Sequence, residues 1–293
     1  PGGRNDDIRQ IRKSPMSSAP PDASGEGLDP NACSDISVVK IGGSQIEELD
    51  RTDTFWTQLA EIRERGPVVL VHGGGAQATE MARRLDHEPE IVEGRRVTSD
   101  LDLEIVLWTM CGELNTRLVA RARTQGLDPI GLTGADGGLI QVEKRPPWTI
   151  EDREIDFGWV GDVTGVRTDP VEDLLAEGYL PILAPLGIDE RGRLFNVNAD
   201  TVACTLAQAL GAGAFYLLTG SGGVQRDPED ASSRIATCDR ALFREGLEAG
   251  WIRDGMKVKL TTAFDALDGG VEEVYVCAPS DLTERERGTQ VVR

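Results

Sequence analysis

The chain of 293 residues has few of the residue types on which several classes of site depend. Its five cysteines are scattered without a CxxC pair, and its only histidines are His72 and His87. A disulfide framework or a zinc site needs such residues clustered or at ligand spacing. The sequence therefore argues against zinc and against a mechanism that uses several histidines, and we expect no metal bound by protein side chains.

Long apolar runs are also missing. No segment approaches the roughly 18–20 apolar residues that span a bilayer, and the first residues lack the apolar core of a signal peptide. We therefore expect a cytoplasmic protein with no membrane partner. The formal net charge of −19 further disfavours nucleic acid or an anionic membrane as a partner.

Lysine is the scarcest charged residue. The 31 basic residues include only five lysines: Lys13, Lys40, Lys144, Lys257 and Lys259. Lysine is a compact point charge that arginine does not replace. In a chain that almost always uses arginine, the remaining lysines are candidates for a function.

The composition divides the chain into two parts. Residues 1–34 are rich in Pro, Gly, Ser and Asp and lack periodicity, which predicts a disordered N-terminal extension; an oligomerisation arm is the alternative. Residues 35–293 alternate apolar runs with amphipathic segments, which predicts an α/β domain with a mostly parallel sheet between helices. The expected strands are 36–41, 68–71, 129–132, 180–183, 214–218 and 273–277, and the expected helices are 53–65, 76–85, 100–124, 171–177, 200–210 and 255–267. Residues 139–164 are expected to form projecting hairpins.

Glycine turns follow two of the predicted strands, at the sheet edge where α/β proteins bind ligands. Gly42 and Gly43 come soon after Lys40, and three glycines follow His72. Glycine lets the backbone approach a phosphate closely, and a helix N-terminus attracts anions. Tight turns would also explain these glycines, and neither cluster has the GxxxxGK[ST] or GxGxxG pattern. His72 is interpreted as a structural residue rather than a base.

Two further segments gather polar side chains. Asn196, Asn198 and Asp200 alternate in an extended segment before a helix, so they should point to one side. Helix capping explains one of the three. Lys257 and Lys259 lie near the start of the last long helix, where a cation opposes the helix dipole unless an anion is bound. A solvated lysine pair is the alternative.

Together and in this order, these segments resemble the amino-acid-kinase family, and within it the acetylglutamate kinases. The similarity runs from about residue 36 to the end. It rests on residues 39–43 (VKIGG), 72–77 (HGGGAQ), 94–98 (GRRVT), 131–138 (GLTGADGG), 161–163 (GDV), 196–200 (NVNAD) and 254–259 (DGMKVK). The resemblance implies the amino-acid-kinase fold, a three-layer α/β/α sandwich. It also implies an N-lobe of about 35–190 that binds an acyl amino acid and a C-lobe of about 191–293 that binds ATP.

The resemblance also implies roles for single residues. Lys40 and Lys259 would be catalytic by stabilising the transferring phosphoryl group, with Asp200 holding the two lysines. The implied substrate-binding residues are Gly43, Gly74, Gly75, Arg96 and Asn196, with Arg96 clamping an α-carboxylate. The implied nucleotide-binding residues are Thr219, Gly220, Ser221, Gly222, Gly223, Val224, Trp251, Ile252 and Arg253.

The implied reaction is transfer of a phosphoryl group from ATP, with Mg²⁺, to the γ-carboxylate of N-acetyl-L-glutamate in arginine biosynthesis. Such a carboxylate has a pKa of about 4.3 and is already a nucleophile at neutral pH, so no general base is needed. The reaction needs charge compensation and in-line positioning. We expect a homodimer without arginine feedback, because residues 1–34 do not resemble the N-terminal helix of arginine-sensitive hexameric members.

Departures from the family pattern leave alternatives open. The nucleotide strand of the family usually ends in Ser/Thr-Asp-Val-x-Gly, whereas residues 219–223 read TGSGG. Residues 288–293 resemble kinases of carrier-protein-linked α-aminoadipate or glutamate, although residues 95–98 and 196–200 look more like the enzymes of the free acetylated amino acid. N-succinylglutamate is another possible acceptor. A non-catalytic ligand sensor, and a kinase that phosphorylates a phosphate, are the remaining alternatives.

Overall fold

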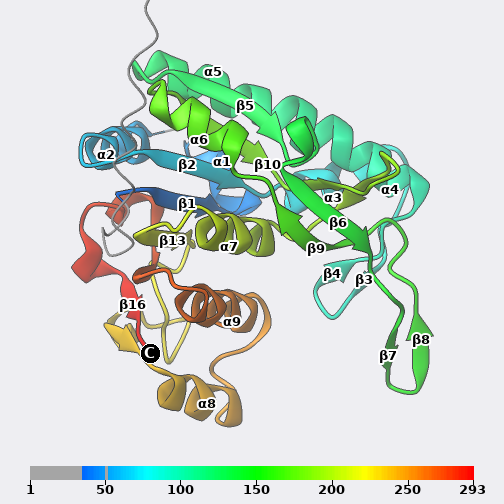
Figure 1. The fold of residues 1–293 in the computed structure, drawn as a ribbon. Coiled ribbons are helices and arrows are strands. Elements are labelled where there is room, and N and C mark those ends of the chain that lie inside the picture. The colour runs from blue at the N-terminus through cyan, green and yellow to red at the C-terminus, as the bar shows by residue number, and fades with distance from the viewer. Residues whose placement is uncertain (1–34, 50–51) are drawn as a thin grey trace, which may run out of the picture. The chain divides into compact units, whose positions relative to one another are not determined.

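An eight-stranded sheet runs through the centre of the structure, a computed structural model that describes residues 35–49 and 52–293 (Figure 1). The extension predicted over residues 1–34 lies outside the described residues. The strands are β1 (Ser37–Ile41), β2 (Val68–His72), β5 (Pro129–Thr133), β10 (Leu180–Ala184), β13 (Ala214–Leu218), β14 (Thr237–Cys238), β15 (Glu273–Cys277) and β16 (Thr289–Val291). Their order is β14-β16-β15-β13-β1-β2-β10-β5. Neighbours from β15 to β5 are parallel, and only the pair β15–β16 is antiparallel.

Helices cover both faces of this sheet. One layer contains α1 (Gly43–Leu49), α2 (Thr54–Arg63), a π-helix η1 (Leu107–Leu114) and α5 (Asn115–Thr124). The opposite layer contains α6 (Asp169–Ala176), α7 (Ala199–Ala209) and α9 (Asp254–Asp268), with α8 (Arg240–Glu248) packed on α9. Successive strand residues point to opposite faces, so Val38 belongs to one apolar core and Val39 to the other. The predicted three-layer α/β/α architecture with a mostly parallel sheet is confirmed.

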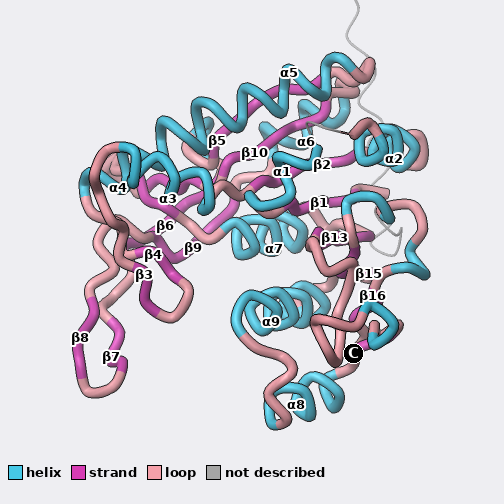
Figure 2. The backbone as a smooth tube through the Cα atoms, turned by 180° about the vertical axis from the view of Figure 1, so that it is seen from behind, coloured by secondary structure: helices cyan, strands magenta, loops and turns pink. Residues whose placement is uncertain are grey.

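A smaller four-stranded sheet and two hairpins extend from the main sheet (Figures 1 and 2). The small sheet has the order β12 (Leu194–Asn196), β11 (Leu186–Ile188), β6 (Ile140–Lys144) and β9 (Gly161–Val166). The hairpins are β3 (Ile91–Val92) with β4 (Arg95–Arg96) and β7 (Trp148–Ile150) with β8 (Arg153–Ile155). Both views show the two hairpins side by side. The hairpins predicted over 139–164 are present as the antiparallel pairs β6–β9 and β7–β8.

The helix predicted over 100–124 is present but not uniform. It consists of α4 (Asp100–Val106), η1 and α5 in direct succession. A π-helix has about one more residue per turn than an α-helix, and apolar spacing alone does not reveal it. The η1 segment places Met110 and Leu114 against the glycine turn after β2: a Cβ added to Gly74 would lie 2.4 Å from Met110 Cγ. Within the described part of the chain, no helix combines the length and the apolar character that crossing a bilayer requires.

His72 closes β2 and is completely buried. Its Nδ1 lies 2.8 Å from the carbonyl oxygen of Gly73, which can only accept, so Nδ1 carries the proton. The amide of Asn115 donates to His72 Nε2 at 3.1 Å and to the carbonyl of Ile182 at 2.9 Å. Burial lowers the pKa of His72 to about 4. The imidazole is therefore a neutral link between β2, β10 and the long helix.

We predict that His72 makes the folded chain less stable as the pH falls from 6.5 towards 4. The unfolded chain takes up this proton near pH 6.5 and the folded chain only near pH 4, so protonation within that window favours unfolding, and the contribution is intact above it. Between pH 7 and pH 5 the loss in the free energy of unfolding from this group should be about 2 kcal/mol. A His72→Gln variant lacks this group. In urea unfolding, its free energy of unfolding should therefore fall by about 2 kcal/mol less than that of the parent between pH 7 and pH 5. An identical pH dependence of the two proteins would contradict this.

Candidate active site

The glycine turns after β1 and β2 interlock at the carboxyl edge of the sheet. A Cβ added to Gly43 would lie 3.0 Å from Gly74 Cα, so neither turn has room for a side chain. The side-chain amide of Gln77 donates to the carbonyl of Gly43 at 2.8 Å and ties the second turn to the first. Gly43 begins α1 and Gly74 precedes α3 (Gly75–Arg84), so their N–H groups have no acceptor within these helices. The two turns can therefore offer backbone N–H donors to an anion.

Three charged side chains from three elements meet beside these turns. Lys40 Nζ, on β1, lies 2.7 Å from Asp200 Oδ1 at the start of α7. Lys259 Nζ, on α9, lies 3.4 Å from the same oxygen. Asn198 caps α7 by accepting from the backbone N–H of Asp200 at 2.8 Å, which fixes the aspartate in the first turn. The structure thus brings together the three residues to which the sequence assigned the catalytic role; we call them the Lys–Asp–Lys group.

Burial controls the electrostatics of the Lys–Asp–Lys group. Lys40 is only 4% exposed and Asp200 only 7%. Burial lowers the pKa of Lys40 to about 8, against the opposing attraction of Asp200. Burial disfavours the Asp200 carboxylate, but the charges of Lys40 and Lys259 outweigh it and hold the pKa of Asp200 below its usual range. Two ammonium groups share one carboxylate, so the group has an excess positive charge near neutral pH.

Lys259 lies in the second turn of its helix, one residue further from the N-terminus than the predicted helix start implied. Because α9 begins at Asp254, Lys257 is in the fourth position and exposed, and Lys259 is in the sixth and points at Asp200. The helix dipole acts mainly on the first turn. The position of Lys259 is therefore explained by its ion pair rather than by the helix N-terminus.

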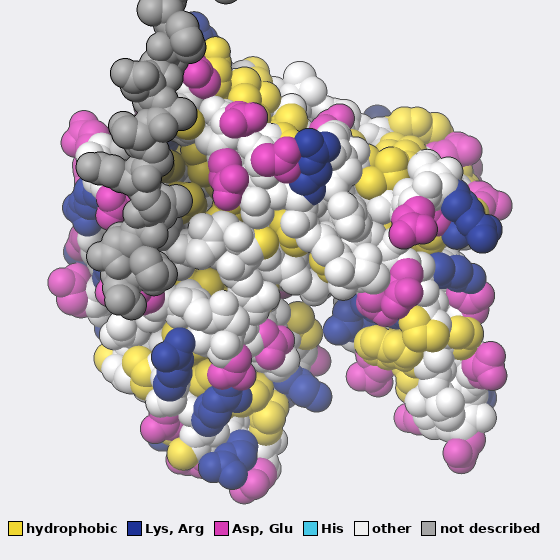
Figure 3. All heavy atoms as spheres, in the orientation of Figure 1, with side chains coloured by type: hydrophobic (Ala, Val, Ile, Leu, Met, Phe, Trp, Pro, Cys, Tyr) yellow, Lys and Arg dark blue, Asp and Glu magenta, His cyan; other side chains and the backbone are white. Residues whose placement is uncertain are grey.

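A cavity of about 550 Å³ opens in front of this group. Figure 3 shows the surface hollowed between α9 and the β7–β8 hairpin. The lining includes Lys40 and Asp200 and all the residues predicted to bind the acceptor: Gly43, Gly74, Gly75, Arg96 and Asn196. The structure therefore gathers the predicted acceptor residues around one space.

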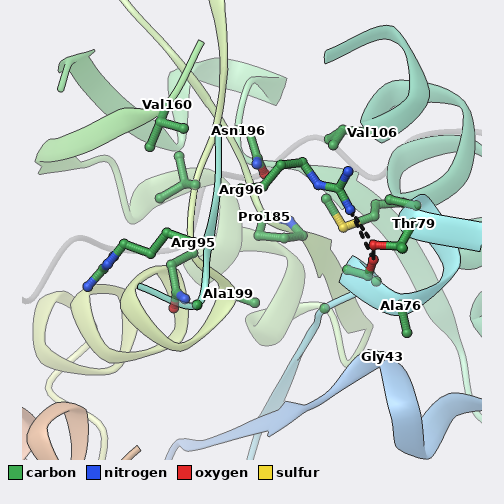
Figure 4. Close-up of a pocket in the computed structure, with 18 of the residues that line it drawn as sticks. Gly43, Ala76, Thr79, Arg95, Arg96, Val106, Val160, Pro185, Asn196 and Ala199 are labelled. Atoms are coloured by element: carbon green, nitrogen blue, oxygen red, sulfur yellow. Dashed lines mark hydrogen bonds between the residues drawn. The ribbon is translucent and has the colours of Figure 1, made fainter. Parts of the chain in front are cut away.

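Arg96 and Asn196 are held in place by other polar groups. Arg96 Nη2 donates to Thr79 Oγ1 at 2.6 Å (Figure 4). Its Nη1 donates to Asp102 Oδ1 at 3.1 Å. Asp102 is itself fixed by a capping box with Ser99 at the start of α4. The amide of Asn196 donates to Thr98 Oγ1 at 3.1 Å. Both side chains are thus oriented before any ligand arrives.

The residues predicted to bind the nucleotide are not part of this cavity's lining. Residues 219–223 form the turn after β13, which is the parallel neighbour of β1, and Gly222 and Gly223 have φ values of +71° and +148° that favour glycine. Gly220, Ser221 and Arg253 are exposed, Gly222 and Trp251 are half-buried, and Thr219, Gly223, Val224 and Ile252 are buried. Val224 and Ile252 are buried in the apolar core, so they can position the turn that would bind a nucleotide but cannot contact the nucleotide themselves.

Several cavity residues were not singled out from the sequence: Thr79, Arg95, Met110 and Arg145. Arg95 could have been inferred from the sequence, because it stands next to Arg96 in a motif that was already recognised. Arg145 follows β6 in a hairpin, and nothing in its local sequence shows that the hairpin faces the glycine turns. Among residues 35–49 and 52–293, no three His, Cys, Asp or Glu side chains gather in a way that could hold a metal ion.

We predict that Asp200→Asn destabilises the fold through the two lysines that it leaves unpaired. Removing one partner of a buried ion pair costs about 3 kcal/mol or more, because the remaining charge stays buried. Urea unfolding at pH 7 should show this loss, and adding Lys40→Met should restore part of it by removing the more buried ammonium. An unchanged stability of the single variant, or no recovery in the double variant, would contradict the interpretation.

Comparisons with known proteins agree with this geometry. A sequence profile described as "Amino acid kinase family" matches residues 35–278. A protein named acetylglutamate kinase from Anaeromyxobacter dehalogenans (strain 2CP-C) is 40% identical over 253 residues, which is 84% of this chain and 93% of that protein. A protein of the same name from Methanopyrus kandleri is 39% identical over 256 residues, which is 87% of this chain and all of that protein.

Solved structures share the fold. A Streptococcus mutans protein superposes with a TM-score of 0.74 at 26% identity, covering 88% of this chain and 98% of that one. An N-acetylglutamate synthase from Neisseria gonorrhoeae superposes with a TM-score of 0.73 at 21% identity, covering 89% of this chain and 60% of that one. At this identity the comparison shows only that the two proteins share a fold. The extent of the profile match, together with these relatives, shows that the chain belongs to the amino acid kinase family.

Proposed function

We propose that the chain catalyses the ATP-dependent phosphorylation of the γ-carboxylate of N-acetyl-L-glutamate. The observation that carries the proposal is the Lys–Asp–Lys group beside two interlocked glycine turns, with Arg96 and Asn196 on the same cavity. The name acetylglutamate kinase, borne by relatives 39–40% identical to this chain, supports the choice of acceptor.

The reaction needs no proton transfer. One oxygen of the γ-carboxylate attacks the γ-phosphorus of ATP, the bond from that phosphorus to the bridging oxygen breaks, and ADP leaves with the electron pair. The products are an acyl phosphate and ADP. Because a carboxylate of pKa about 4.3 is already ionised at neutral pH, the neutral and inward-facing His72 is not required as a base.

Charge compensation is the main task of the site, because two anions must meet. Lys40 and Lys259 would face the transferring phosphoryl group, and Asp200 would keep both ammonium groups aligned between turnovers. The N–H groups of Gly43 and Gly74 would donate to the same oxygens. Such preset donors need no reorganisation at the moment of transfer, which is how they lower the barrier.

Arg96 would bind the α-carboxylate of the acceptor. Its guanidinium lies at the cavity beside the carbonyl of Gly75 and is held there by Thr79 and Asp102. A guanidinium can donate two parallel hydrogen bonds to one carboxylate, which fixes the direction of the acceptor as well as its position. Asn196 would hold the amide of the acyl group, an interaction that free glutamate cannot make.

ATP would bind across the turn formed by residues 219–223. This turn follows β13, and the parallel pairing of β13 with β1 brings it next to the turn that follows Lys40. The glycines at positive φ and the excess positive charge of the Lys–Asp–Lys group fit a polyphosphate. Mg²⁺ bound to the phosphates of ATP would supply further charge compensation; the oxygens of Asp200 already face ammonium groups.

The remaining parts of the proposal concern organisation. Residues that bind the acceptor would come mainly from 35–190 and those that bind ATP from 191–293, as two lobes of one domain. A cytoplasmic homodimer is proposed, without nucleic acid or membrane partners. Trp108, 51% exposed, and Leu101, 36% exposed, lie on the long helix formed by α4 and η1 and would contribute apolar side chains to the contact between subunits.

The decisive experiment is a coupled assay of ADP release with ATP and Mg²⁺, at low and at molar salt. N-acetyl-L-glutamate should support rapid turnover and free L-glutamate should not, because only the former offers an amide to Asn196. No ADP release with N-acetyl-L-glutamate at either salt level would reject the proposal. The alternatives would then be a carrier-linked acceptor and a non-catalytic ligand sensor.

The two lysines of α9 provide a matched pair of variants for the same assay. Lys259→Met should lower kcat by about 100-fold or more, since it removes a charge that acts on the transferring group. Lys257→Met removes an equal charge from an exposed position of the same helix and should leave kcat unchanged. Equal effects of the two substitutions would show that the pairing of Lys259 with Asp200 has no catalytic importance.

A further inference from the structure

The hairpin that carries Arg96 is short and has little backbone pairing of its own. Strand β4 consists of Arg95 and Arg96 alone, and it is joined to β3 through only two residue pairs. A two-stranded hairpin is marginally stable at best in water unless other elements pack against it. The position of Arg96 at the cavity therefore depends on what holds β4 from outside the hairpin.

Side chains on two sides hold β4. Successive residues of a strand point in opposite directions, and Figure 4 shows Arg96 extending towards Thr79 and Arg95 away from it. On the first side, Arg96 donates to Thr79 on α3 and to Asp102 on α4. On the other side, the Cζ atom of Arg95 lies 5.0 Å from the centroid of the Trp148 ring, at the start of β7. The strand is thus held between two helices and the β7–β8 hairpin.

The Trp148 ring is itself firmly supported. The Cζ atom of Arg145 lies 4.9 Å from the ring centroid, and Arg145 is only 8% exposed. The Nε and Nη2 atoms of Arg145 donate to Asp162 Oδ1 on β9 at 2.8 and 2.5 Å. The indole also packs edge-on against Phe157, which is completely buried, with 5.2 Å between the ring centroids. Trp148 can therefore act as a rigid support for Arg95.

A backbone link between the two hairpin segments lies further along the chain. The N–H group of Thr98 donates to the carbonyl of Phe157 at 2.9 Å, and this bond lies two residues beyond Arg96. In the part of the chain that the structure describes, the Arg95 guanidinium makes no ion pair. Its stack on Trp148 is therefore a principal contact by which β4 itself is joined to the β7–β8 hairpin.

We propose that Trp148 is a positioning residue, which holds β4 through Arg95 and so keeps the guanidinium of Arg96 at the cavity. This inference rests on the proposed function, because it assumes that Arg96 binds the α-carboxylate of the acceptor. Trp148 is not one of the residues that line the cavity, so it acts on the site through Arg95.

Loss of the stack should weaken binding of the acceptor and leave the chemical step unchanged. Without it, only a fraction of the free molecules would have β4 in place, and the apparent affinity for the acceptor would fall by that fraction. A saturating concentration of acceptor selects the molecules in which β4 is in place. The effect should therefore appear in the KM for the acceptor, and kcat and the KM for ATP should be retained.

Steady-state kinetics of Trp148→Leu should accordingly show a raised KM for N-acetyl-L-glutamate. A cation–π contact that is partly removed from water corresponds to a factor of about 3 to 30, and we expect an increase of this size. Trp148→Phe should retain part of the affinity, because a phenyl ring attracts a guanidinium less strongly than an indole does. As a control, Arg153→Gln removes an exposed arginine from the β7–β8 hairpin and should leave both constants unchanged.

A double-mutant cycle with Arg95→Met tests whether the stack is the cause. Arg95→Met should raise the KM about as much as Trp148→Leu does. The double variant should raise it no further, because each substitution removes the same contact. Effects of the two substitutions that multiply, or a fall in kcat without a rise in KM, would overturn the proposal.

Hydrogen exchange at the amides of residues 91–97 separates this inference from the proposed function, because it needs no turnover. If no acceptor is turned over, but these amides exchange faster in Trp148→Leu and Arg95→Met than in the parent and Arg153→Gln, the positioning of β4 is supported and the kinase function fails. If N-acetyl-L-glutamate is turned over, but exchange and KM are the same in all these proteins, Trp148 has no positioning role and the kinase function stands.

Discussion

The buried pairing of Lys40 and Lys259 with Asp200 is the constraint on which the rest of this structure depends. Two ammonium groups largely removed from water are tolerable only if a carboxylate stands between them and the geometry is fixed. The fold meets this requirement by bringing a central strand and two helices of one layer to a single point. Packing of α7 on α9 and on β1 is therefore also the means by which the positive charges are positioned.

The opposite helical layer shapes the other wall of the site. The interlocked turns at Gly43 and Gly74 leave no room for a side chain, and Met110 and Leu114 of the π-helix fill the space directly behind Gly74. The extra residue per turn of η1 changes which side chains face the sheet. The contacts of Met110 and Leu114 with Gly74 thus pack the apolar core and also fix the turn whose backbone N–H groups face the site.

Much of this arrangement could be predicted from the sequence, and the remainder depended on long-range pairing. Continuous apolar runs identified the six parallel strands, and the ordered motifs identified Lys40, Asp200 and Lys259 before their contact was visible. The strands β11 and β12 were missed because three residues are too few to show a period, and helix α8 was missed although its residues have amphipathic helical spacing. Arg145 was missed because its place at the cavity is set by how a hairpin folds back, which no local pattern encodes. The π-helix was missed because its apolar spacing resembles that of an α-helix.

The central position of β1 has a consequence for how the chain folds during its synthesis. Lys40 is made before its partners: β1 gains its neighbour β13 only later, and the counter-charge and the second ammonium follow on α7 and α9. Contacts between such distant parts of a chain form slowly, since the intervening loop must be closed first. A nascent chain therefore holds an unpaired cation in a strand of the core until α7 and α9 have been made. A chain that ends before α9 lacks Lys259, so a ligand cannot stabilise it through the complete Lys–Asp–Lys group.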